Sequence, residues 1–294
     1  MVILPDFMNL INESSGYTWE EAVSWLRNQP DKQQLVIDAY YDDPLIHSAD
    51  RYWQSQEWVA IRSLLPPDKG CALDIGAGRG IASYALAKEG YRVTALEPNP
   101  SSLVGASAIR QLATESALPI NVVDSFSESL PFENSTFDLV FARAVLHHTN
   151  DLNSACREFF RVLRPGGLLI AVREHVISRP NDLPEFLMQH PLHSLYGGEN
   201  AFLLSDYQTA LRLASFNLQR TIAPFDSPIN FAPRSTAELR REISSKVSFG
   251  SGLFARLIYL MLGNPVLWLF LRKILALVDH RPGRLYSFVA MRPH

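Results

Sequence analysis

The segment LDIGAGRG, residues 73–80, constrains the fold of this chain more than any other feature. A short apolar run ends in Asp74, and three glycines follow at alternate positions, Gly76, Gly78 and Gly80. Apolar, helix-forming residues come next. This order predicts a strand, a tight turn and the start of a helix, because glycine adopts positive φ readily and lets a ligand approach the backbone. Such turns bind nucleotide-like cofactors in doubly wound sheets, at the free N–H groups of the helix N-terminus.

The spacing of this turn favours one cofactor over another. NAD-binding turns follow the pattern GxGxxG and hold a pyrophosphate, whereas this turn reads DxGxGxG. The carboxylate of Asp74 would repel a pyrophosphate and attract an ammonium or sulfonium group. The pattern therefore points to S-adenosylmethionine (SAM). Glu97 ends the next apolar segment, 91–96, at the position where an acid grips a ribose diol.

Further motifs over about a hundred residues resemble the class I SAM-dependent methyltransferases, in the branch that includes ubiquinone and menaquinone methyltransferases. The matching segments are LDIGAGRG, the strand end at Glu97, SESLPFENSTFDLVFARAVLHH and EFFRVLRPGG. The resemblance implies methyl transfer from SAM to oxygen, carbon or nitrogen of a small, partly apolar molecule, such as a natural product, a lipid-like compound or an isoprenoid. Two other classes stay open, a non-catalytic SAM- or nucleotide-binding regulatory protein and an NAD-dependent oxidoreductase.

The expected fold is α/β, with a doubly wound, seven-stranded, mostly parallel sheet. Helical spacing before residue 67, with a capping box at Thr18 and Glu21, predicts a helical N-terminal cap over residues 1–66. Residues 67–294 form the SAM-binding domain. The best candidate for the last strand is 285–291, so residues 225–284 are expected to be a helical insertion before it.

The resemblance implies cofactor contacts at nine positions, which are Asp74, Gly76, Ala77, Gly78, Gly80, Glu97, Pro98, Ser125 and Arg143. In this branch an acid near the adenine amine usually stands where this chain has Phe126. Either Asp124 contacts the adenine instead, or Phe126 stacks on it; the position of Asp124 at a strand end favours the acid. Tyr41 and Arg51, on the N-terminal helices, are candidates for the methionine end of SAM, with core packing as the alternative for the tyrosine.

Histidines supply the candidates for removing a proton from the substrate, because their pKa lies near neutrality. His147, His148 and His175 are the candidate bases, and Glu174 is a further candidate or the orienting partner of His175. A structural role is the alternative for His147 and His148. No metal is expected, because the pair formed by residues 190 and 193 lacks a third ligand at a recognised spacing.

The composition excludes several other classes. The net charge of −3 gives no indication of a nucleic-acid-binding face. Two cysteines are too few for a disulfide framework. The first residues lack the pattern of a signal peptide, so the expected location is the cytoplasm.

The apolar stretch 252–278 is interrupted at Gly263–Pro265 and predicts two helices rather than a membrane span. Its roles stay open among a lid that lines an apolar substrate pocket, a peripheral membrane contact, a homo-oligomer interface and ordinary core; the lid is favoured.

Overall fold

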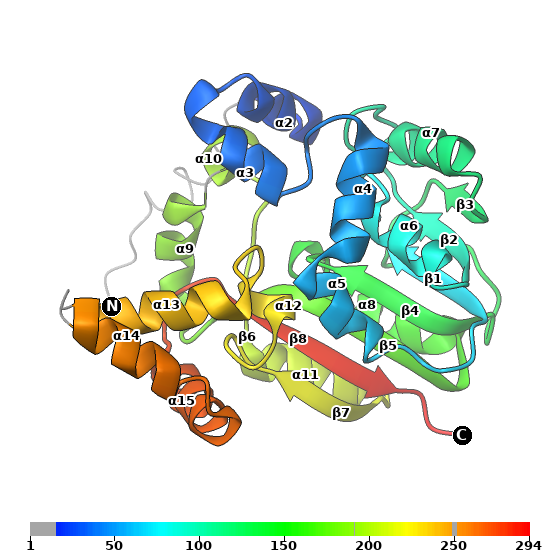
Figure 1. Ribbon diagram of the computed structural model, residues 1–294. Helices are drawn as coiled ribbons and strands as arrows, with labels where there is room; N and C mark the ends of the chain where they lie inside the picture. The colour runs from blue at the N-terminus through cyan, green and yellow to red at the C-terminus, as the bar shows by residue number, and fades with distance from the viewer. Residues whose placement is uncertain (1–15, 191, 249–251) are drawn as a thin grey trace, which may run out of the picture.

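The central element of this computed structural model, which describes residues 16–190, 192–248 and 252–294, is an eight-stranded sheet (Figure 1). The strand order is β3-β2-β1-β4-β5-β8-β7, and the short β6 pairs with β5. Strands β1 to β5 run parallel, and β8 inserts antiparallel between β5 and β7. The strands are β1 (Cys71–Ile75), β2 (Arg92–Leu96), β3 (Ile120–Val123), β4 (Phe137–Arg143), β5 (Leu163–Ile177), β6 (Phe202–Leu203), β7 (Asn217–Ile222) and β8 (Arg284–Met291). The predicted doubly wound fold is confirmed, with the two-residue β6 as an addition.

Helices cover both faces of the sheet because the strands are apolar on both sides. In β1, Leu73 and Ile75 face a core shared with α8 and α11, whereas Ala72 faces a core shared with α5 and α6. The helical segments between β1 and β7 are α6 (Ile81–Lys88), α7 (Ala106–Ser116), η2 (Leu146–His148), α8 (Leu152–Val162), η3 (Pro180–Asp182), α9 (Leu183–Gln189), α10 (His193–Tyr196) and α11 (Leu204–Leu213).

From residue 16 onward, five helical segments precede the sheet, namely α2 (Trp19–Arg27), η1 (Pro30–Lys32), α3 (Gln33–Asp38), α4 (Leu45–Gln54) and α5 (Gln56–Arg62). The capping box of Thr18 and Glu21 is present at the start of α2. The sequence predicts one helix over residues 50–65, and the structure instead has α4 and α5. The break falls at Ser55, whose backbone is extended and whose side chain accepts the N–H of Trp58 at 3.1 Å to cap α5.

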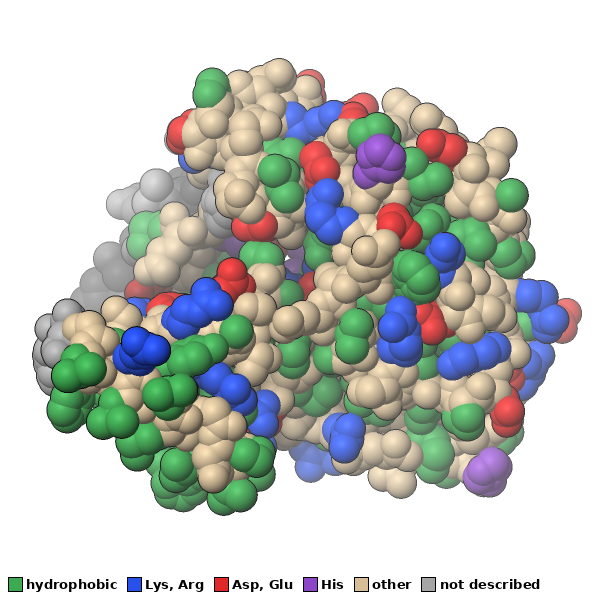
Figure 2. All heavy atoms as spheres, viewed as in Figure 1, with side chains coloured by type: hydrophobic (Ala, Val, Ile, Leu, Met, Phe, Trp, Pro, Cys, Tyr) green, Lys and Arg blue, Asp and Glu red, His purple; other side chains and the backbone are tan. Residues whose placement is uncertain are grey.

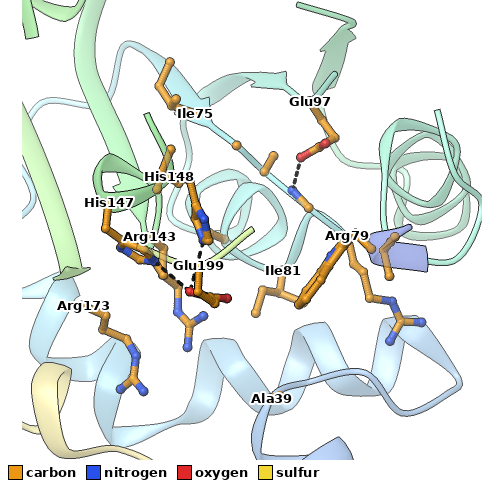
Figure 3. A pocket seen from close by; sticks show the side chains of 18 of the residues that line it. Ala39, Ile75, Arg79, Ile81, Glu97, Arg143, His147, His148, Arg173 and Glu199 are labelled. Carbon is orange, nitrogen blue, oxygen red and sulfur yellow. Dashed lines mark hydrogen bonds and ion pairs between the residues drawn. The ribbon is translucent and has the colours of Figure 1, made fainter. Parts of the chain in front are cut away.

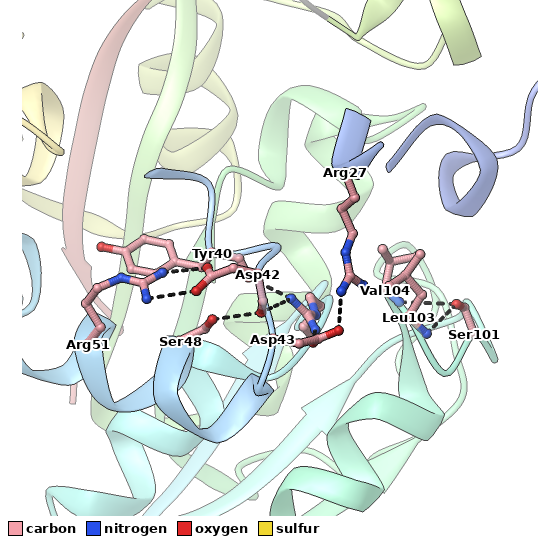
Figure 4. A network of polar contacts seen from close by, with 10 residues as sticks. Arg27, Tyr40, Asp42, Asp43, Ser48, Arg51, Ser101, Leu103 and Val104 are labelled. Atoms are coloured by element: carbon pink, nitrogen blue, oxygen red, sulfur yellow. Dashed lines mark hydrogen bonds and ion pairs between the residues drawn. The ribbon is translucent and has the colours of Figure 1, made fainter. Parts of the chain in front are cut away.

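An arginine within the glycine-rich turn fastens the N-terminal helices to the sheet. Arg79 is buried, and its Nη1 donates to the backbone oxygens of Tyr40 and Asp42, each at 3.0 Å. Its Nη2 pairs with Asp43 at 2.5 Å. Asp43 also pairs with Arg27 of α2 (Figure 4). The loop between α3 and α4 is therefore held directly over the turn.

The region between β7 and β8 is helical, as predicted, with α12 (Pro228–Phe231), α13 (Thr236–Val247), α14 (Gly252–Met261) and α15 (Pro265–Val278). A small apolar cluster holds these helices together around Phe231, Leu239, Leu262 and Trp268. No single helix of the described residues is long and apolar enough to cross a bilayer. Helices α14 and α15 meet that requirement only as a pair, and they are bent by 104° relative to each other.

We expect Trp58→Ala to lower the free energy of unfolding by about 3–5 kcal/mol, because it removes a fully buried side chain. It also removes the Nε1 hydrogen bond to Glu89 of 3.1 Å, which links α5 to the end of α6. Urea denaturation measures the loss. The neighbouring Val59 is 52% exposed, so Val59→Ala is the matched control and should change stability by about 0.5 kcal/mol or less. Equal effects of the two substitutions would contradict the docking of the N-terminal helices on the core.

Candidate active site

A cavity of about 680 Å³ opens beyond the carboxyl ends of β1, β2, β4 and β5 (Figure 3). This is where ligands bind in doubly wound sheets. The residues predicted for the site that line it are Tyr41, Asp74, Gly76, Ala77, Gly78, Glu97, Pro98, Ser125, Phe126, Arg143, His147, His148 and His175. Four other predicted residues, Arg51, Gly80, Asp124 and Glu174, are not among the described residues that line the cavity.

The three glycines of the turn serve different purposes. All three have positive φ, at +58°, +55° and +83° for Gly76, Gly78 and Gly80. A Cβ atom at Gly76 would meet the side chain of Val145 at 2.9 Å, and one at Gly80 would meet Ile109 at 3.1 Å. A Cβ atom at Gly78 would meet nothing within 4 Å. Two glycines thus allow close packing behind the turn, and Gly78 borders open space in the cavity.

Glu97 is fixed at the end of β2 by backbone hydrogen bonds. Its Oε2 accepts the N–H of Gly78 at 2.7 Å, and its Oε1 accepts the N–H of Asn99 at 2.9 Å. Burial raises the pKa of Glu97, while these two hydrogen bonds oppose that shift. Each carboxylate oxygen keeps a second lone pair. The side chain can therefore accept two further hydrogen bonds, as the ribose diol of a nucleoside requires.

Asp74 lies at the floor of the cavity without a cationic partner at hydrogen-bond distance among the described residues. Ser83 donates its hydroxyl to Asp74 Oδ2 at 2.6 Å. Burial raises the pKa of this carboxyl to about 7, and the nearby Glu97 adds to the shift. A positively charged ligand group beside Asp74 would favour the ionised form. The chemistry of the site therefore fits the ammonium or sulfonium of SAM rather than a pyrophosphate.

Asp124 and Arg51 have partners outside the cavity. Asp124 pairs with Arg110 at 2.7 Å, and its side chain is 52% exposed. Phe126, the other residue considered for the adenine, does line the cavity. Arg51 binds the Asp42 carboxylate, with its closest contact at 2.6 Å. Their sequence positions alone could not show this, because both outcomes depend on which helix packs beside them.

Two arginines share one buried acid at the side of the cavity. Arg143 Nε donates to Glu57 Oε1 at 2.7 Å, and Arg173 Nη1 lies 3.6 Å from Glu57 Oε2. Burial opposes ionisation of Glu57, but the two guanidinium groups outweigh it and lower its pKa. Both arginines line the cavity, so this side carries one net positive charge. Glu57 comes from the N-terminal helices, and sequence reasoning gave it no role.

The three candidate bases are held in defined orientations by their Nδ1 atoms. His147 Nδ1 lies 2.7 Å from Glu174 Oε2, His148 Nδ1 lies 2.9 Å from the Gly198 oxygen, and His175 Nδ1 lies 2.8 Å from the Gly283 oxygen. A carbonyl oxygen only accepts, so Nδ1 of His148 and of His175 carries the hydrogen, and in the neutral imidazole Nε2 is the acceptor. Burial lowers the pKa of His147 well below its usual value and that of His175 to about 3.

Glu174 has a positioning role in this arrangement. It is fully buried, and besides the His147 ring it accepts the N–H groups of Val145 at 3.2 Å and His147 at 3.1 Å. Burial raises its pKa to about 7, against the effect of these hydrogen bonds. Glu174 therefore orients His147 and the turn that carries it. The sequence suggested Glu174 as a base or as the partner of His175, and its partner in the structure is His147.

Glu199 completes the cluster, and sequence reasoning missed it. Its carboxylate lies beside His147 and His148, as Figure 3 shows, with Oε2 at 3.7 Å and 3.9 Å from their Nε2 atoms. Its Oε1 lies 3.7 Å from His190 Nε2 and accepts the hydroxyl of Tyr196. Glu199 follows a pair of glycines in the connection between α10 and β6, and no spacing relates it to the histidine pair some fifty residues earlier.

Comparisons with known proteins agree with this geometry. Residues 73–171 match the family model described as a methyltransferase domain. The ubiquinone biosynthesis O-methyltransferase of Methylobacterium sp. (strain 4-46) is 38% identical over 99 residues, which are 34% of this chain and 39% of that protein. The sarcosine/dimethylglycine N-methyltransferase of Halorhodospira halochloris is 28% identical over 222 residues, covering 73% and 74% of the two chains. A solved geranyl diphosphate methyltransferase in complex with SAM has a TM-score of 0.55 at 16% identity, covering 86% of this chain and 94% of that chain.

Residues 73–171 thus resemble the methyltransferase domain of SAM-dependent enzymes. The resemblance to the ubiquinone-type branch is confirmed, and SAM is the cofactor of this family. The chain spans about two fifths of the length of the ubiquinone O-methyltransferases that it matches, from 38% to 43%. The match ends near the middle of β5, so the cofactor half of the methyltransferase cavity lies inside it and Glu199 lies beyond it.

The favoured hypothesis for the insertion 225–284, a lid that lines the substrate pocket, fails for residues 252–278; among the described residues of the insertion, Pro233 alone lines the cavity. Among the described residues, none from α14 or α15 lines the cavity. Residues from α2, α3 and α10 line it instead, including Trp19, Leu35 and Tyr196. Trp19 packs edge-on against both Tyr41 and Tyr196, with ring centroids 5.9 Å and 4.6 Å apart. The cavity is thus covered by an aromatic contact between Trp19 of α2 and Tyr196 of α10.

We expect Glu97→Ala to weaken the binding of S-adenosylhomocysteine by about 10- to 100-fold, since hydrogen bonds to a charged group contribute roughly 1.5–3 kcal/mol each. Isothermal titration calorimetry measures the change. Asp124→Ala is the control, because Asp124 faces solvent and Arg110 rather than the cavity. It should alter the dissociation constant by less than about threefold, in line with the small value of exposed ion pairs. A larger loss in Asp124→Ala than in Glu97→Ala would place the nucleoside elsewhere.

Proposed function

We propose that this protein transfers the methyl group of SAM to a hydroxyl group on a small, partly apolar molecule. The observation that carries this proposal is the set of oriented histidines facing the same cavity as the glycine turn. SAM supplies an electrophilic methyl group when bound. The chain's own residues hold the substrate oxygen in line and accept its hydrogen bond. The oxygen gains the methyl group, its proton passes to the histidine Nε2 that accepts its hydrogen bond and then to solvent, and S-adenosylhomocysteine is the second product.

The orientation of the histidines supports a substrate hydroxyl. Because their Nδ1 atoms are engaged by carbonyl or carboxylate oxygens, His148 and His175 present Nε2 as the free acceptor of the ring. A hydroxyl that donates to such an acceptor is held with its lone pairs directed away from the ring. Holding the reacting oxygen and methyl carbon about 3–3.5 Å apart can lower the activation barrier by several kcal/mol. A non-catalytic SAM-binding protein has no use for such a cluster, which weighs against that alternative.

The walls of the cavity support an apolar substrate body. Opposite the glycine turn, the described lining includes Trp19, Tyr41, Leu192 and Tyr196, which belong to one apolar cluster between α2, α3 and α10. Ligand pockets of this kind combine an apolar lining with a few polar groups that fix orientation. The ubiquinone biosynthesis O-methyltransferases among the relatives are named for methyl transfer to oxygen in the biosynthesis of ubiquinone. This chemistry fits the cavity better than that of a small amino acid such as sarcosine.

Methyl transfer from radiolabelled SAM to an alkylated catechol, with sarcosine as the polar comparison, tests the proposal. We expect transfer to the catechol and none to sarcosine, and His148→Ala should lower kcat by about 100-fold through loss of substrate positioning. Its affinity for SAM should stay unchanged. The exposed His280 does not line the cavity, and His280→Ala serves as the control. Transfer to sarcosine alone, full turnover in His148→Ala, or tight NAD binding would overturn the proposal.

The surface formed by α14 and α15 supports a second part of the proposed function, contact with a membrane. Apolar side chains gather over these helices, and basic side chains lie beside them (Figure 2). Leu253 is 84% exposed and Leu277 is 76% exposed. Helical spacing places Leu257, Leu260 and Met261 on one face of α14, and this face points outward, whereas Trp268 packs inward. So large an exposed apolar patch marks an interaction site rather than ordinary surface.

Charge and geometry favour a lipid surface as the partner of this patch. Residues 252–278 contain three basic side chains, Arg256, Arg272 and Lys273, and no acidic one. Helices of 10 and 14 residues are too short to span a bilayer. Their 104° bend lets both lie in the plane of an interface, with leucine and phenylalanine side chains inserted and Arg256 near anionic headgroups. Arg272 and Lys273 are engaged by the backbone and the side chain of Asp226. We therefore propose that the protein contacts an anionic membrane surface, where apolar substrates concentrate.

Co-sedimentation with vesicles of phosphatidylglycerol and phosphatidylcholine tests this contact. We expect the wild-type protein to bind, and the triple variant Leu253→Ser, Leu257→Ser, Leu260→Ser to bind at least about 10-fold less, since each inserted leucine contributes on the order of 1 kcal/mol or more. Leu213→Ser is the matched control, because Leu213 is 65% exposed on α11, outside the patch. Light scattering after gel filtration checks for a dimer. A stable dimer without vesicle binding would assign the patch to a second copy of the chain instead.

A further inference from the structure

A buried carboxylate oxygen without a partner lies at the centre of the histidine cluster. The Glu199 side chain is 6% exposed, and its Oε2 has no hydrogen-bond partner among the described residues. The atoms closest to it in the cluster are the Nε2 atoms of His147 and His148, at 3.7 Å and 3.9 Å. These distances are too long for hydrogen bonds. An unpaired buried carboxylate costs several kcal/mol unless a cation compensates it.

The distances from Glu199 Oε2 to the two histidine nitrogens are those expected between ligands of one ion. Ligand atoms about 2.0–2.2 Å from a zinc ion lie roughly 3.4 Å apart at a tetrahedral angle and about 4.1 Å apart when opposite each other. The two nitrogen–oxygen distances fall between these limits, and all three ligand atoms lie within 4.8 Å of one another. Nitrogen and carboxylate donors in this ratio suit divalent transition metals rather than magnesium or calcium.

The groups around the three atoms are arranged as the outer partners of metal ligands. The Nδ1 of His147 is engaged by Glu174, and that of His148 by the Gly198 oxygen. Metal-binding histidines almost always donate their second ring nitrogen to such a group, which fixes the ring and directs the other nitrogen at the ion. The second oxygen of Glu199 is held by the hydroxyl of Tyr196. The free atoms of the cluster are therefore the ones that would bind.

We infer that the protein binds one divalent transition-metal ion through His147 Nε2, His148 Nε2 and Glu199 Oε2. Two histidines and one carboxylate leave a fourth position open, as in catalytic zinc sites. All three residues line the cavity, so the open position faces the substrate. His175 and His190 form a second group of possible ligands around the same carboxylate, but Glu199 Oε1 on that side is already engaged by Tyr196.

An ion in this position would deepen the proposed function, on which this part of the inference rests. The Nε2 of His148 would then bind the ion, and the ion would hold the substrate oxygen in its place. A divalent ion lowers the pKa of an oxygen ligand by several units. A substrate hydroxyl bound at the open position would then release its proton to solvent on binding and present an oxygen anion. Such a site selects hydroxyl-bearing substrates over amines that are protonated at neutral pH.

Metal titration of the chelator-treated protein tests the site without any substrate. Calorimetry with zinc chloride should give one ion per chain, and cobalt chloride should give the visible absorption of a four-coordinate ion. Glu199→Gln and His148→Ala should each weaken zinc binding by at least about 100-fold, because loss of an outer partner alone costs 10- to 100-fold. His47→Ala is the control, since His47 is exposed on α4 and far from the cluster in sequence. Thermal unfolding checks that each variant is folded.

The outcomes separate this inference from the proposed function. Binding of one ion that both Glu199→Gln and His148→Ala abolish supports the inference. Zinc affinity that is unchanged in a folded Glu199→Gln variant overturns it, as does the absence of zinc binding by the wild-type chain. Loss of zinc binding in His190→Ala with retention in His148→Ala would overturn the ligand set in favour of the second group. Methyl transfer by a protein that binds no metal would support the proposed function and overturn the inferred metal site.

Discussion

The buried guanidinium of Arg79 joins the parts of this molecule on which the site depends. It stands within the glycine-rich turn, yet its hydrogen bonds go to the loop that links α3 and α4. The turn and the N-terminal helices are thereby fixed relative to each other. Tyr41 and Trp19 consequently close one side of the cavity, and Glu57 reaches Arg143 across it. Without this contact the cofactor end of the cavity would lack its cover.

Burial without full compensation is the common electrostatic feature of the cavity. Burial raises the pKa of both Asp74 and Glu174 to about 7, and it lowers the pKa of His147 and His175. Between about pH 4 and pH 7 the folded protein therefore keeps protons on two carboxyls that are ionised in the unfolded chain. The contribution of these two groups to the free energy of unfolding falls as the pH rises from about 4 to about 7. Sites with such shifted groups are typical of catalytic or ligand-binding positions.

The molecule divides its apolar surface between two tasks. The aromatic contact of α2 with α10 lines the cavity, and it involves partly buried side chains. The helices α14 and α15 instead present most of their apolar residues outward, while Ile258, Trp268 and Leu271 pack in a small separate core. The apolar wall of the cavity fits a small apolar ligand, and the exposed apolar face of α14 and α15 fits a lipid surface. An enzyme that draws its substrate from a lipid surface would need both.

The sequence determined the fold because local signals and sheet order agree. Glycines 76, 78 and 80, the acid at residue 97 and the apolar segments predicted β1 to β5 and their carboxyl-end site, and the antiparallel last strand lies where expected. Tertiary structure alone decided which polar residues meet. Asp124 pairs with Arg110, Glu174 pairs with His147, and Glu199 lies beside histidines some fifty residues away in sequence. Periodicity also gave the shared face of Leu257 and Leu260 but not its direction. A period reports which side chains lie together, whereas burial depends on what packs against them, and that is set by contacts distant in sequence.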